Sequence, residues 1–479
     1  MRTKILIFSI LFLYLTASCQ KSEYVKNFDW MVKTFQENDA GYETYLKQKG
    51  EKNIAIYTNE CREKILQAKS EQECISIMNE WLHYFRKGHI GVFPNRNNDS
   101  NIYQYNNEKK IALSKEDFTS YLQINKNSIH PIEGIWTNQY YTIGIIKSKN
   151  DNNHFESFII EANNPYWTPG QIKAELNLLE DNSFDVTFLM KDHTKKQTTI
   201  KWHGHNQNII RINGIFWVKA YPKTDNQDQL FYEFVTSNKP FIKKLSESTI
   251  YLRIPSFELS NKEAIDKLLE SNDNLIKSTP NLIIDIRYGT GGSDYSHYGL
   301  IPYYFTNSIR NMSLTYRATE LNALAYEKYA RQHIDSNAAN FCRTIAKKMR
   351  ENLGGYYDSG TNTGVITSYN ALKYPAKIAI ICNKNNASAD EGFLYMARQS
   401  YKVKIFGEST AGAFDFSNVN IVDFPDGKSV LWITMSMSKR LPNYQIDDIG
   451  IQPDYFIEHS TEEKDWVTYV RSVIEEISD

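Results

Sequence analysis

The sequence has 479 residues, of which 41% are hydrophobic and 23% are charged, and its formal net charge is -1. A chain of this length exceeds what one hydrophobic core organises, so two or three domains are expected. The composition is that of a folded protein and excludes a largely disordered one. Because the charges nearly balance and no long basic run is present, a nucleic-acid partner is not expected.

The N-terminus predicts an export signal that is not part of the fold. Arg2 and Lys4 precede an apolar run over residues 5–15, and small residues then lead to Cys19. This end resembles the lipobox at which bacterial lipoproteins are cleaved and acylated, although Thr16 stands where leucine is usual. The resemblance implies a signal peptide over residues 1–19 and a mature chain tethered by lipid to the bacterial cell envelope, facing the periplasm or displayed on the cell surface. An ordinary cleaved signal is the alternative.

The remaining cysteines do not predict a metal site. They are Cys61, Cys74, Cys342 and Cys382, and none stands at the spacing of zinc ligands. Cys61 and Cys74 could pair across two helices in an oxidising compartment, which the sequence leaves open. We therefore expect neither a metal nor another cofactor.

Three regions follow the signal. Apolar residues recur at helical spacing up to Phe85, which predicts an N-terminal helical domain over residues 20–130. Short alternating segments with Asn, Asp and Gly turns predict a β-rich meander or small barrel over 131–225, which could accept a ligand. Alternating strands and helices predict an α/β domain over 240–479.

The α/β region carries clear strand and helix patterns. Runs that are apolar on both faces predict strands of a covered parallel sheet. We expect strands at 249–254, 281–286, 377–382 and 403–406, a helix at 260–277, a mostly helical insertion at 306–357, and a hairpin joining 419–424 to 429–435.

Two segments of this region could support catalysis. Ser388 follows the strand at 377–382 and opens a helical pattern, where free N–H groups could stabilise an alkoxide or an oxyanion. An isolated serine at a helix start is more often only a cap. The turn Tyr288-Gly289-Thr290-Gly291-Gly292 follows another buried strand and could aim N–H groups into a cleft, or it could be a tight turn without function.

Five blocks in order resemble the C-terminal-processing, or tail-specific, serine protease family. The resemblance implies a ClpP- or crotonase-like α/β catalytic domain with Ser388 as the nucleophile. A further block, Lys87-Gly88-His89-Ile90, is similar to the family's N-terminal Asp-Gly-His-Thr block. The five blocks are Tyr251 to Phe257, Leu282 to Gly292, Ser388 to Glu391, Gly407 to Gly412, and Gly450 to Asp454.

The sequence departs from this family at the catalytic base. Members with a Ser/Lys dyad carry the lysine at the position of Ala413. A serine hydroxyl is a poor nucleophile without a base. The tricorn-protease branch uses instead a histidine matching His89 and an acid before the last block, here Asp447 or Asp448. The resemblance therefore implies that Ser388 attacks, His89 transfers the proton and Asp447 orients the imidazole.

Other site residues follow from the same comparison. Backbone N–H groups of Ala389 and of Gly291 or Gly292 would hold the oxyanion. Glu408 and Glu391 are alternative acids, and Glu391 could only cap the helix. Lys428 is an alternative base.

Two functions remain open. The first is a serine-type peptidase, either an endopeptidase or a carboxy-terminal processing enzyme, that cleaves exported or cell-envelope proteins or peptides. The second is a catalytically silent lipoprotein that binds a ligand or peptide on the same fold. No PDZ module is recognisable before the catalytic region, so the sequence leaves open whether substrate C-termini are recognised.

Overall fold

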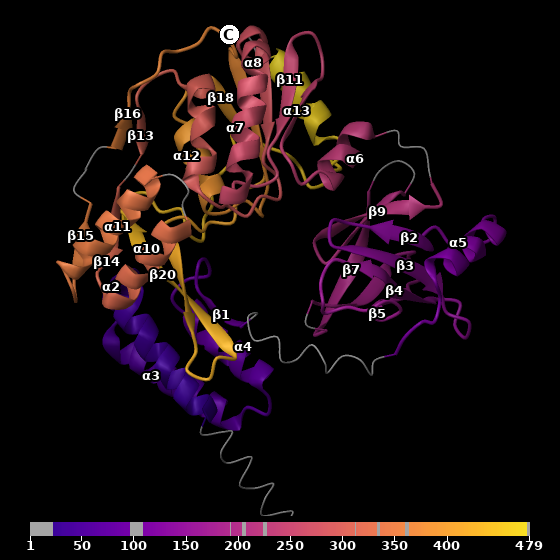
Figure 1. Cartoon of the computed structure of the whole chain (residues 1–479), viewed down its shortest axis with the longest axis horizontal. Coiled ribbons are helices and arrows are strands. Elements are labelled where there is room, and N and C mark those ends of the chain that lie inside the picture. The colour runs from indigo at the N-terminus through magenta and orange to yellow at the C-terminus, as the bar shows by residue number, and fades with distance from the viewer. Residues whose placement is uncertain are drawn as a thin grey trace, which may run out of the picture. The chain divides into compact units, whose positions relative to one another are not determined.

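A computed structural model of the chain describes residues 23–95, 109–191, 193–203, 207–223, 228–311, 313–332, 336–359 and 364–476 (Figure 1). The predicted export signal and Cys19 lie outside these ranges. The chain divides into two compact units. One comprises the described parts of Met1–Asn98 and Ile242–Phe456, and the other those of Asp99–Phe241 and Ile457–Asp479.

A six-stranded sheet forms the centre of the first unit. Its neighbours pair in parallel from β11 onward, with β12 between β11 and β17. The predicted fold class, α/β with helical and β-rich parts, is confirmed. The strand order is β10 (Phe241–Lys244), β11 (Thr249–Arg253), β12 (Asn281–Asp285), β17 (Lys377–Cys382), β18 (Val403–Gly407) and β21 (Tyr455–Phe456).

Three of the helices that share one apolar core with this sheet are α7 (Lys262–Ser271), α8 (Asp273–Ser278) and α12 (Ala389–Ala397) (Figure 1). Alternate strand residues, such as Leu282 and Ile284 on β12, point into this core, because successive side chains of a strand face opposite ways. The expected helix at 260–277 is two helices broken at Asn272, after a 3-10 turn at Leu259–Asn261.

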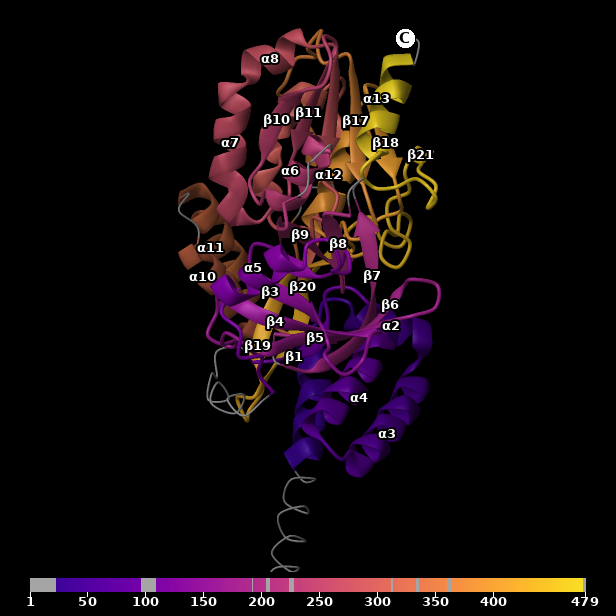
Figure 2. The same ribbon diagram turned by 90° about the vertical axis from the view of Figure 1, so that its right-hand side faces the viewer.

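The helical region packs on a second, antiparallel sheet of the same unit. This sheet runs β1, β20, β14 and β15, and β19 pairs with β20. Side chains of α3 and α4, which lie side by side in Figures 1 and 2, share a core with Leu431 and Ile433 of β20. Residues 23–38 are also helical. The elements are α2 (Tyr42–Lys49), α3 (Glu51–Gln67), α4 (Glu71–His83), β1 (Gly91–Pro94), β14 (Leu314–Arg317), β15 (Tyr356–Asp358), β19 (Phe416–Asp423) and β20 (Ser429–Ser438).

The expected insertion at 306–357 is helical only in its middle. Two helices, α10 (Glu320–Gln332) and α11 (Ser336–Arg350), pack around Tyr326 and Ile345. Short strands flank them, because β14 and β15 extend the second sheet. The remaining short elements are the 3-10 turns Asp294–Ser296 and Tyr298–Leu300, α9 (Ile301–Tyr304), β13 (Ile309–Asn311) and β16 (Gly364–Ile366).

The second unit is built on a closed barrel of eight antiparallel strands, as the alternating pattern predicted. Phe118 and Leu122 of α5 pack on the barrel with Phe158 of β4, so this helix belongs to the barrel unit and not to the helical region. The strands are β2 (Gly134–Thr137), β3 (Tyr141–Lys147), β4 (His154–Ala162), β5 (Ile172–Leu178), β6 (Phe184–Leu189), β7 (Lys195–His203), β8 (Ile209–Ile212) and β9 (Ile215–Tyr221), and the helices are α5 (Lys115–Ile124), α6 (Gln229–Thr236) and α13 (Trp466–Glu476).

The cysteines of the described chain are free and buried, so Cys61 and Cys74 do not form the disulfide that the sequence left open. Within the same ranges, no cluster of three or more His, Cys, Asp or Glu could hold a metal ion. No helix among the described residues has both the length and the apolar character needed to cross a bilayer.

A buried ion pair joins the helical region to the second sheet. Nη1 and Nη2 of Arg86 donate to the carboxylate of Asp39, at 2.8 and 2.6 Å, and both side chains are fully buried. The same carboxylate accepts hydrogen bonds from the N–H and hydroxyl groups of Thr434 on β20. Removing one partner of such a pair would leave a buried charge without compensation.

We predict that Arg86→Met lowers the free energy of unfolding by about 3–5 kcal/mol, because Asp39 then stays buried and unpaired. The matched control is Arg62→Met, which breaks the part-exposed pair with Asp29 and should cost less than about 1 kcal/mol. Urea unfolding of both variants measures the difference. Equal losses would contradict the prediction.

Candidate functional site

Three loops meet at the carboxyl edge of the parallel sheet. They follow β12, β17 and β18, which are neighbours in the sheet, so residues 286–292, 383–388 and 408–413 lie side by side. Ligand sites of parallel α/β sheets lie at this edge. Three of the five sequence blocks contribute residues to these loops, including Ser388 at the end of the second loop.

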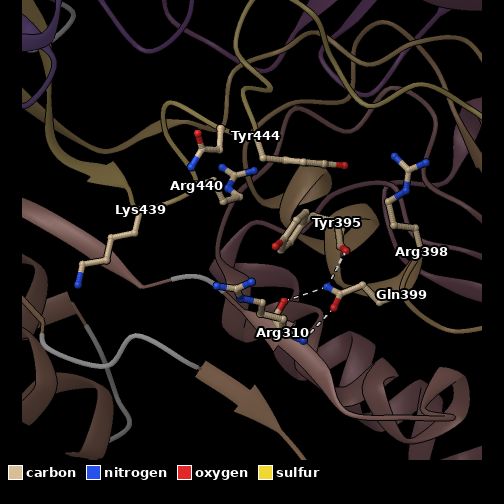
Figure 3. A pocket seen from close by; sticks show the side chains of 8 residues that line it. Arg310, Tyr395, Arg398, Gln399, Lys439, Arg440 and Tyr444 are labelled. Carbon is tan, nitrogen blue, oxygen red and sulfur yellow. Dashed lines mark hydrogen bonds between the residues drawn. The ribbon is translucent and has the colours of Figure 1, made fainter.

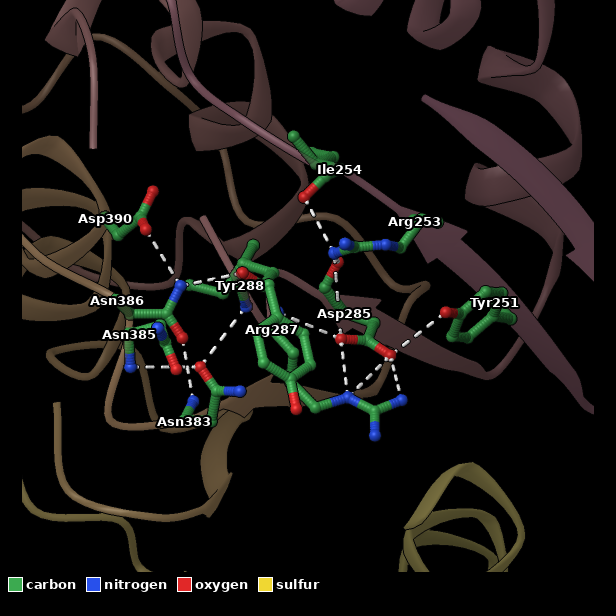
Figure 4. A network of polar contacts seen from close by, with 11 residues as sticks. Tyr251, Arg253, Ile254, Asp285, Arg287, Tyr288, Asn383, Asn385, Asn386 and Asp390 are labelled. Carbon is green, nitrogen blue, oxygen red and sulfur yellow. Dashed lines mark hydrogen bonds and ion pairs between the residues drawn. The ribbon is translucent and has the colours of Figure 1, made fainter. Parts of the chain in front are cut away.

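A buried polar network fixes the end of β12 (Figure 4). Arg287 donates to the Asp285 carboxylate through Nη2 at 2.6 Å, and the Tyr251 hydroxyl donates to the same oxygen at 3.0 Å. Arg253 donates to the main-chain oxygens of Ile254 and Asp285. Burial raises the pKa of Asp285, but Arg287 and Arg253 outweigh it and the pKa lies below its ordinary value.

The glycine-rich turn after β12 packs on the turn before Ser388. Asn386 donates to the main-chain oxygen of Ile286 at 2.7 Å and to the Asp390 carboxylate at 2.8 Å (Figure 4). Burial raises the pKa of Asp390 to about 7. A Cβ at Gly289 would lie 2.5 Å from this carboxylate, so only glycine fits there.

Ser388 stands in a strained backbone conformation at the N-terminus of α12. Its φ is +58° and its ψ is -119°, which is unusual for a residue with a side chain. Its N–H group donates to the Ala413 carbonyl and to the Glu391 carboxylate, each at 3.1 Å. A Cβ at Gly291 would lie 2.7 Å from the Ser388 Cβ, so the glycine turn approaches the serine closely.

The Glu391 carboxylate holds this arrangement. Besides the Ser388 N–H it accepts hydrogen bonds from the Thr410 hydroxyl and from the N–H groups of Gly412 and Ala413, both at 2.8 Å. Burial raises the pKa of Glu391, and these hydrogen bonds lower it in part. Each oxygen already accepts from two donors, so Glu391 positions the serine loop and is not free to orient a histidine.

His89 lies between α4 and β1, also at a strained φ of +58°. Its Nδ1 is 2.6 Å from the carbonyl oxygen of Phe416 on β19. Because a carbonyl oxygen only accepts, Nδ1 carries the hydrogen and Nε2 of the neutral ring is left as a base. Burial lowers the pKa of His89 below its ordinary value, and the nearby Arg86 lowers it further.

Contacts of Gly88 and Arg86 bring His89 toward the serine loop. A Cβ at Gly88 would lie 2.6 Å from the Ala413 Cβ, and the carbonyl of Ala413 holds the Ser388 N–H. Arg86 donates to the Gly88 carbonyl at 3.2 Å, and its guanidinium lies 4.7 Å from the centre of the Phe416 ring. The position of the family lysine is thus filled by the small side chain against which the histidine segment packs.

The predicted third residue, Asp447, contacts the main chain beside Phe416. Its Oδ1 accepts from the N–H groups of Phe414 and Asp415, each at 2.6 Å, while Oδ2 is buried without a hydrogen-bond partner. Burial raises the pKa of Asp447 to about 7. Among the described hydrogen bonds, none joins His89 to Asp447, so its orienting role remains a prediction.

The other candidates lie in separate settings. Asp448 is exposed at a φ of +65°, and its N–H donates to the Gly412 carbonyl. Glu408 follows β18 and accepts from the Lys384 N–H at 3.4 Å. Lys428 is in the β19–β20 hairpin 3.7 Å from Glu23, at the opposite end of β19 from Phe416. That strand spans roughly 20 Å at about 3.3 Å per residue, which argues against Lys428 as the base.

Two of the predicted oxyanion donors, Ala389 and Gly291, lie next to Ser388. Ala389 is the first residue of α12, where N–H groups have no partner within the helix. The N–H of Gly291 lies near the Asp390 carboxylate and lowers its pKa in part. Gly292 forms a parallel bridge with Phe257, and a Cβ there would lie 2.3 Å from that residue's backbone.

Comparison with models of protein families finds a match to one family. Residues 248–457 match the model of peptidase family S41. No protein in a search of curated sequences matches the chain. The matched range contains all five blocks but not His89.

Solved structures resemble the whole chain at low identity. Mature CPAF complexed with lactacystin has a TM-score of 0.52 at 13% identity, over 95% of this chain and 98% of that one. A putative peptidase from Parabacteroides merdae has a TM-score of 0.43 at 12% identity, over 94% and 98%. The photosystem II D1 C-terminal processing protease has a TM-score of 0.40 at 11% identity, over 94% and 97%. The likeness to CPAF shows a shared fold.

The four donors on Glu391 generate a prediction about stability. Glu391→Gln replaces one acceptor oxygen by an NH2 group that faces N–H or O–H donors, and should lower the free energy of unfolding by about 2–3 kcal/mol. Glu263→Gln is the matched control, because Glu263 also stands in a first helical turn but is exposed, and little change is expected. Urea unfolding tests both, and equal effects would contradict the positioning role.

Proposed function

From the match of residues 248–457 to the model of peptidase family S41 we infer that this chain is a serine peptidase with Ser388 as its nucleophile. The observation that carries the proposal is the strained backbone of Ser388 at a strand-to-helix turn. Such strain persists only where the surrounding structure holds it, and it gathers at active sites. Here Glu391, Ala413 and Gly291 hold it.

In the proposed mechanism the Ser388 Oγ attacks the scissile carbonyl and its proton passes to Nε2 of His89, which later returns the proton to the leaving amine. The bond from Nδ1 to the Phe416 carbonyl supports this tautomer. The N–H groups of Ala389 and of Gly291 or Gly292 would stabilise the oxyanion at the positive end of α12. Asp447 would stabilise the imidazolium.

The substrate is proposed to be a peptide or protein of the cell envelope. This part rests on the sequence alone, because the signal and Cys19 predict export and a lipid anchor. Mass spectrometry of the mature N-terminus would test it, and an unmodified N-terminus without acyl groups would contradict the anchor.

We predict that Ser388→Ala abolishes both peptide hydrolysis and labelling by a fluorophosphonate probe, because the attacking oxygen is lost. His89→Gln should lower kcat by roughly a hundredfold or more, since the proton acceptor is removed. Ser278→Ala and His459→Gln are exposed controls that should keep activity. A wild-type protein that binds peptides but neither hydrolyses them nor reacts with the probe would support the silent binding protein instead.

The pH dependence provides a separate prediction. Because burial lowers the pKa of His89 below 6.5, more than half of its imidazole is neutral at pH 6.5, and the midpoint of the fall in kcat/KM should lie below that pH. A profile of kcat/KM between pH 4 and 8 measures this limb. A limb near pH 7 would instead assign the limb to protonation of Asp447, whose pKa is about 7 and whose charge is proposed to stabilise the imidazolium.

A further inference from the structure

A basic pocket lies beside the C-terminal end of α12, the helix whose N-cap is Ser388. It has a volume of about 520 Å³ and lies within the first unit (Figure 3). Its lining contains four cations, two tyrosines and two amides, and no acidic residue: Arg310, Tyr395, Arg398, Gln399, Lys439, Arg440, Asn443 and Tyr444. A site of this kind suits an anionic group that carries an apolar stem.

The walls of the pocket are held by the surrounding elements. Gln399 accepts from the Arg310 N–H and donates to the Arg310 carbonyl, both at 2.8 Å, and also donates to the Tyr395 carbonyl at 3.1 Å (Figure 3). These bonds join β13 to the end of α12. The Arg440 guanidinium stacks 5.1 Å from the centre of the Tyr395 ring. The main chain of Arg310 and the guanidinium of Arg440 are therefore held in place.

Three of the four cations have carboxylate partners outside the lining. Arg398 pairs with Asp454, Lys439 with Asp358 and Arg440 with Asp415. Within the described chain no ion pair joins Arg310 to a carboxylate, and Arg310 is exposed.

Arg440 adds a second observation that indicates a ligand. Its side chain is only 3% exposed, and it donates to the Ser438 hydroxyl and the Phe414 carbonyl. Its remaining nitrogen, Nη1, is buried without a hydrogen-bond partner. A buried charged donor without an acceptor is costly, and a carboxylate in the pocket would supply the acceptor.

The pocket is within reach of a peptide at Ser388. Tyr395 follows Ser388 by two helical turns, or about 10 Å along α12, which equals roughly three residues of extended peptide. Phe414 lies between them, because its ring packs on Gly392 and Arg440 while its N–H donates to Asp447. A side chain or chain end a few residues from the scissile bond could therefore enter the pocket.

We propose that this pocket is a substrate subsite that binds a carboxylate of the peptide, a few residues from the bond that is cleaved. The carboxylate comes from an Asp or Glu side chain or from the C-terminus of the substrate, which present the same chemistry. The proposal rests on the proposed peptidase function. Arg310 and Arg398, whose side chains are partly or fully exposed, bind the carboxylate together with the buried Arg440.

The test measures binding to the full chain carrying Ser388→Ala, which does not depend on catalysis. Short neutral peptides with one Glu at successive positions are compared with the same peptides carrying Gln, and each is made with a free and with an amidated C-terminus. We expect one Glu position, or the free C-terminus, to bind roughly tenfold more tightly. A preferred Glu position would show that the pocket binds an acidic side chain, and a preferred free C-terminus would show that it binds the chain end.

The second part of the test substitutes two arginines of the pocket. Arg310→Gln combined with Arg398→Gln should remove the preference while the neutral peptides keep their affinity. Arg343→Gln, an exposed arginine of α11 outside the pocket, should leave the preference intact. Equal affinities for all four peptide forms, or a preference that survives the double substitution, would overturn the proposal. If selective binding is found but the unsubstituted chain never hydrolyses peptides, the peptidase function fails while the subsite stands.

Discussion

The carboxylate of Glu391 is the interaction on which the candidate site depends. It accepts from Ser388 on α12 and from three groups of the loop after β18, so one buried anion joins the nucleophile segment to the loop that faces the histidine. An ionised carboxylate can accept four hydrogen bonds through its two oxygens, whereas a protonated acid or a glutamine amide cannot. The same carboxylate lies at the positive end of α12, where the helix dipole stabilises an anion.

Two strained residues are held by two different sheets. Ser388 is fixed at the carboxyl edge of the parallel sheet, and His89 at the start of β1 in the antiparallel sheet. Each positive φ costs on the order of 1–3 kcal/mol. The buried Asp39–Arg86 pair and the Glu391 hydrogen bonds over-determine these conformations, since each binds main-chain groups next to the strained residue.

Local sequence patterns predicted the helices and strands well, but they did not predict the contacts that these elements make with one another. The strand at 377–382 was predicted with its observed bounds, because a fully apolar run between turns is unambiguous. The break at Asn272 was missed, since the apolar spacing continues across it. In the site, Ser388 and Gly291 carry motif signals, whereas the histidine's partner is the Phe416 carbonyl. A main-chain oxygen carries no sequence signal, and the donors on Glu391 are brought to it only by the fold.

This chain has Ala413 where family members with a Ser/Lys dyad carry lysine, so under the proposed mechanism the catalytic base comes from another part of the chain. A lysine at residue 413 would lie in the loop after β18, so the α/β region alone could supply both the nucleophile and the base. His89 comes from the segment that follows α4, and this segment is placed by the packing of the helical region on β20. Arg86 connects the histidine segment to this packing, because it neutralises Asp39, binds the Gly88 carbonyl and stacks on Phe416. Under the proposed mechanism, folding of residues 23–95 onto β20 is therefore a condition for catalysis as well as for stability.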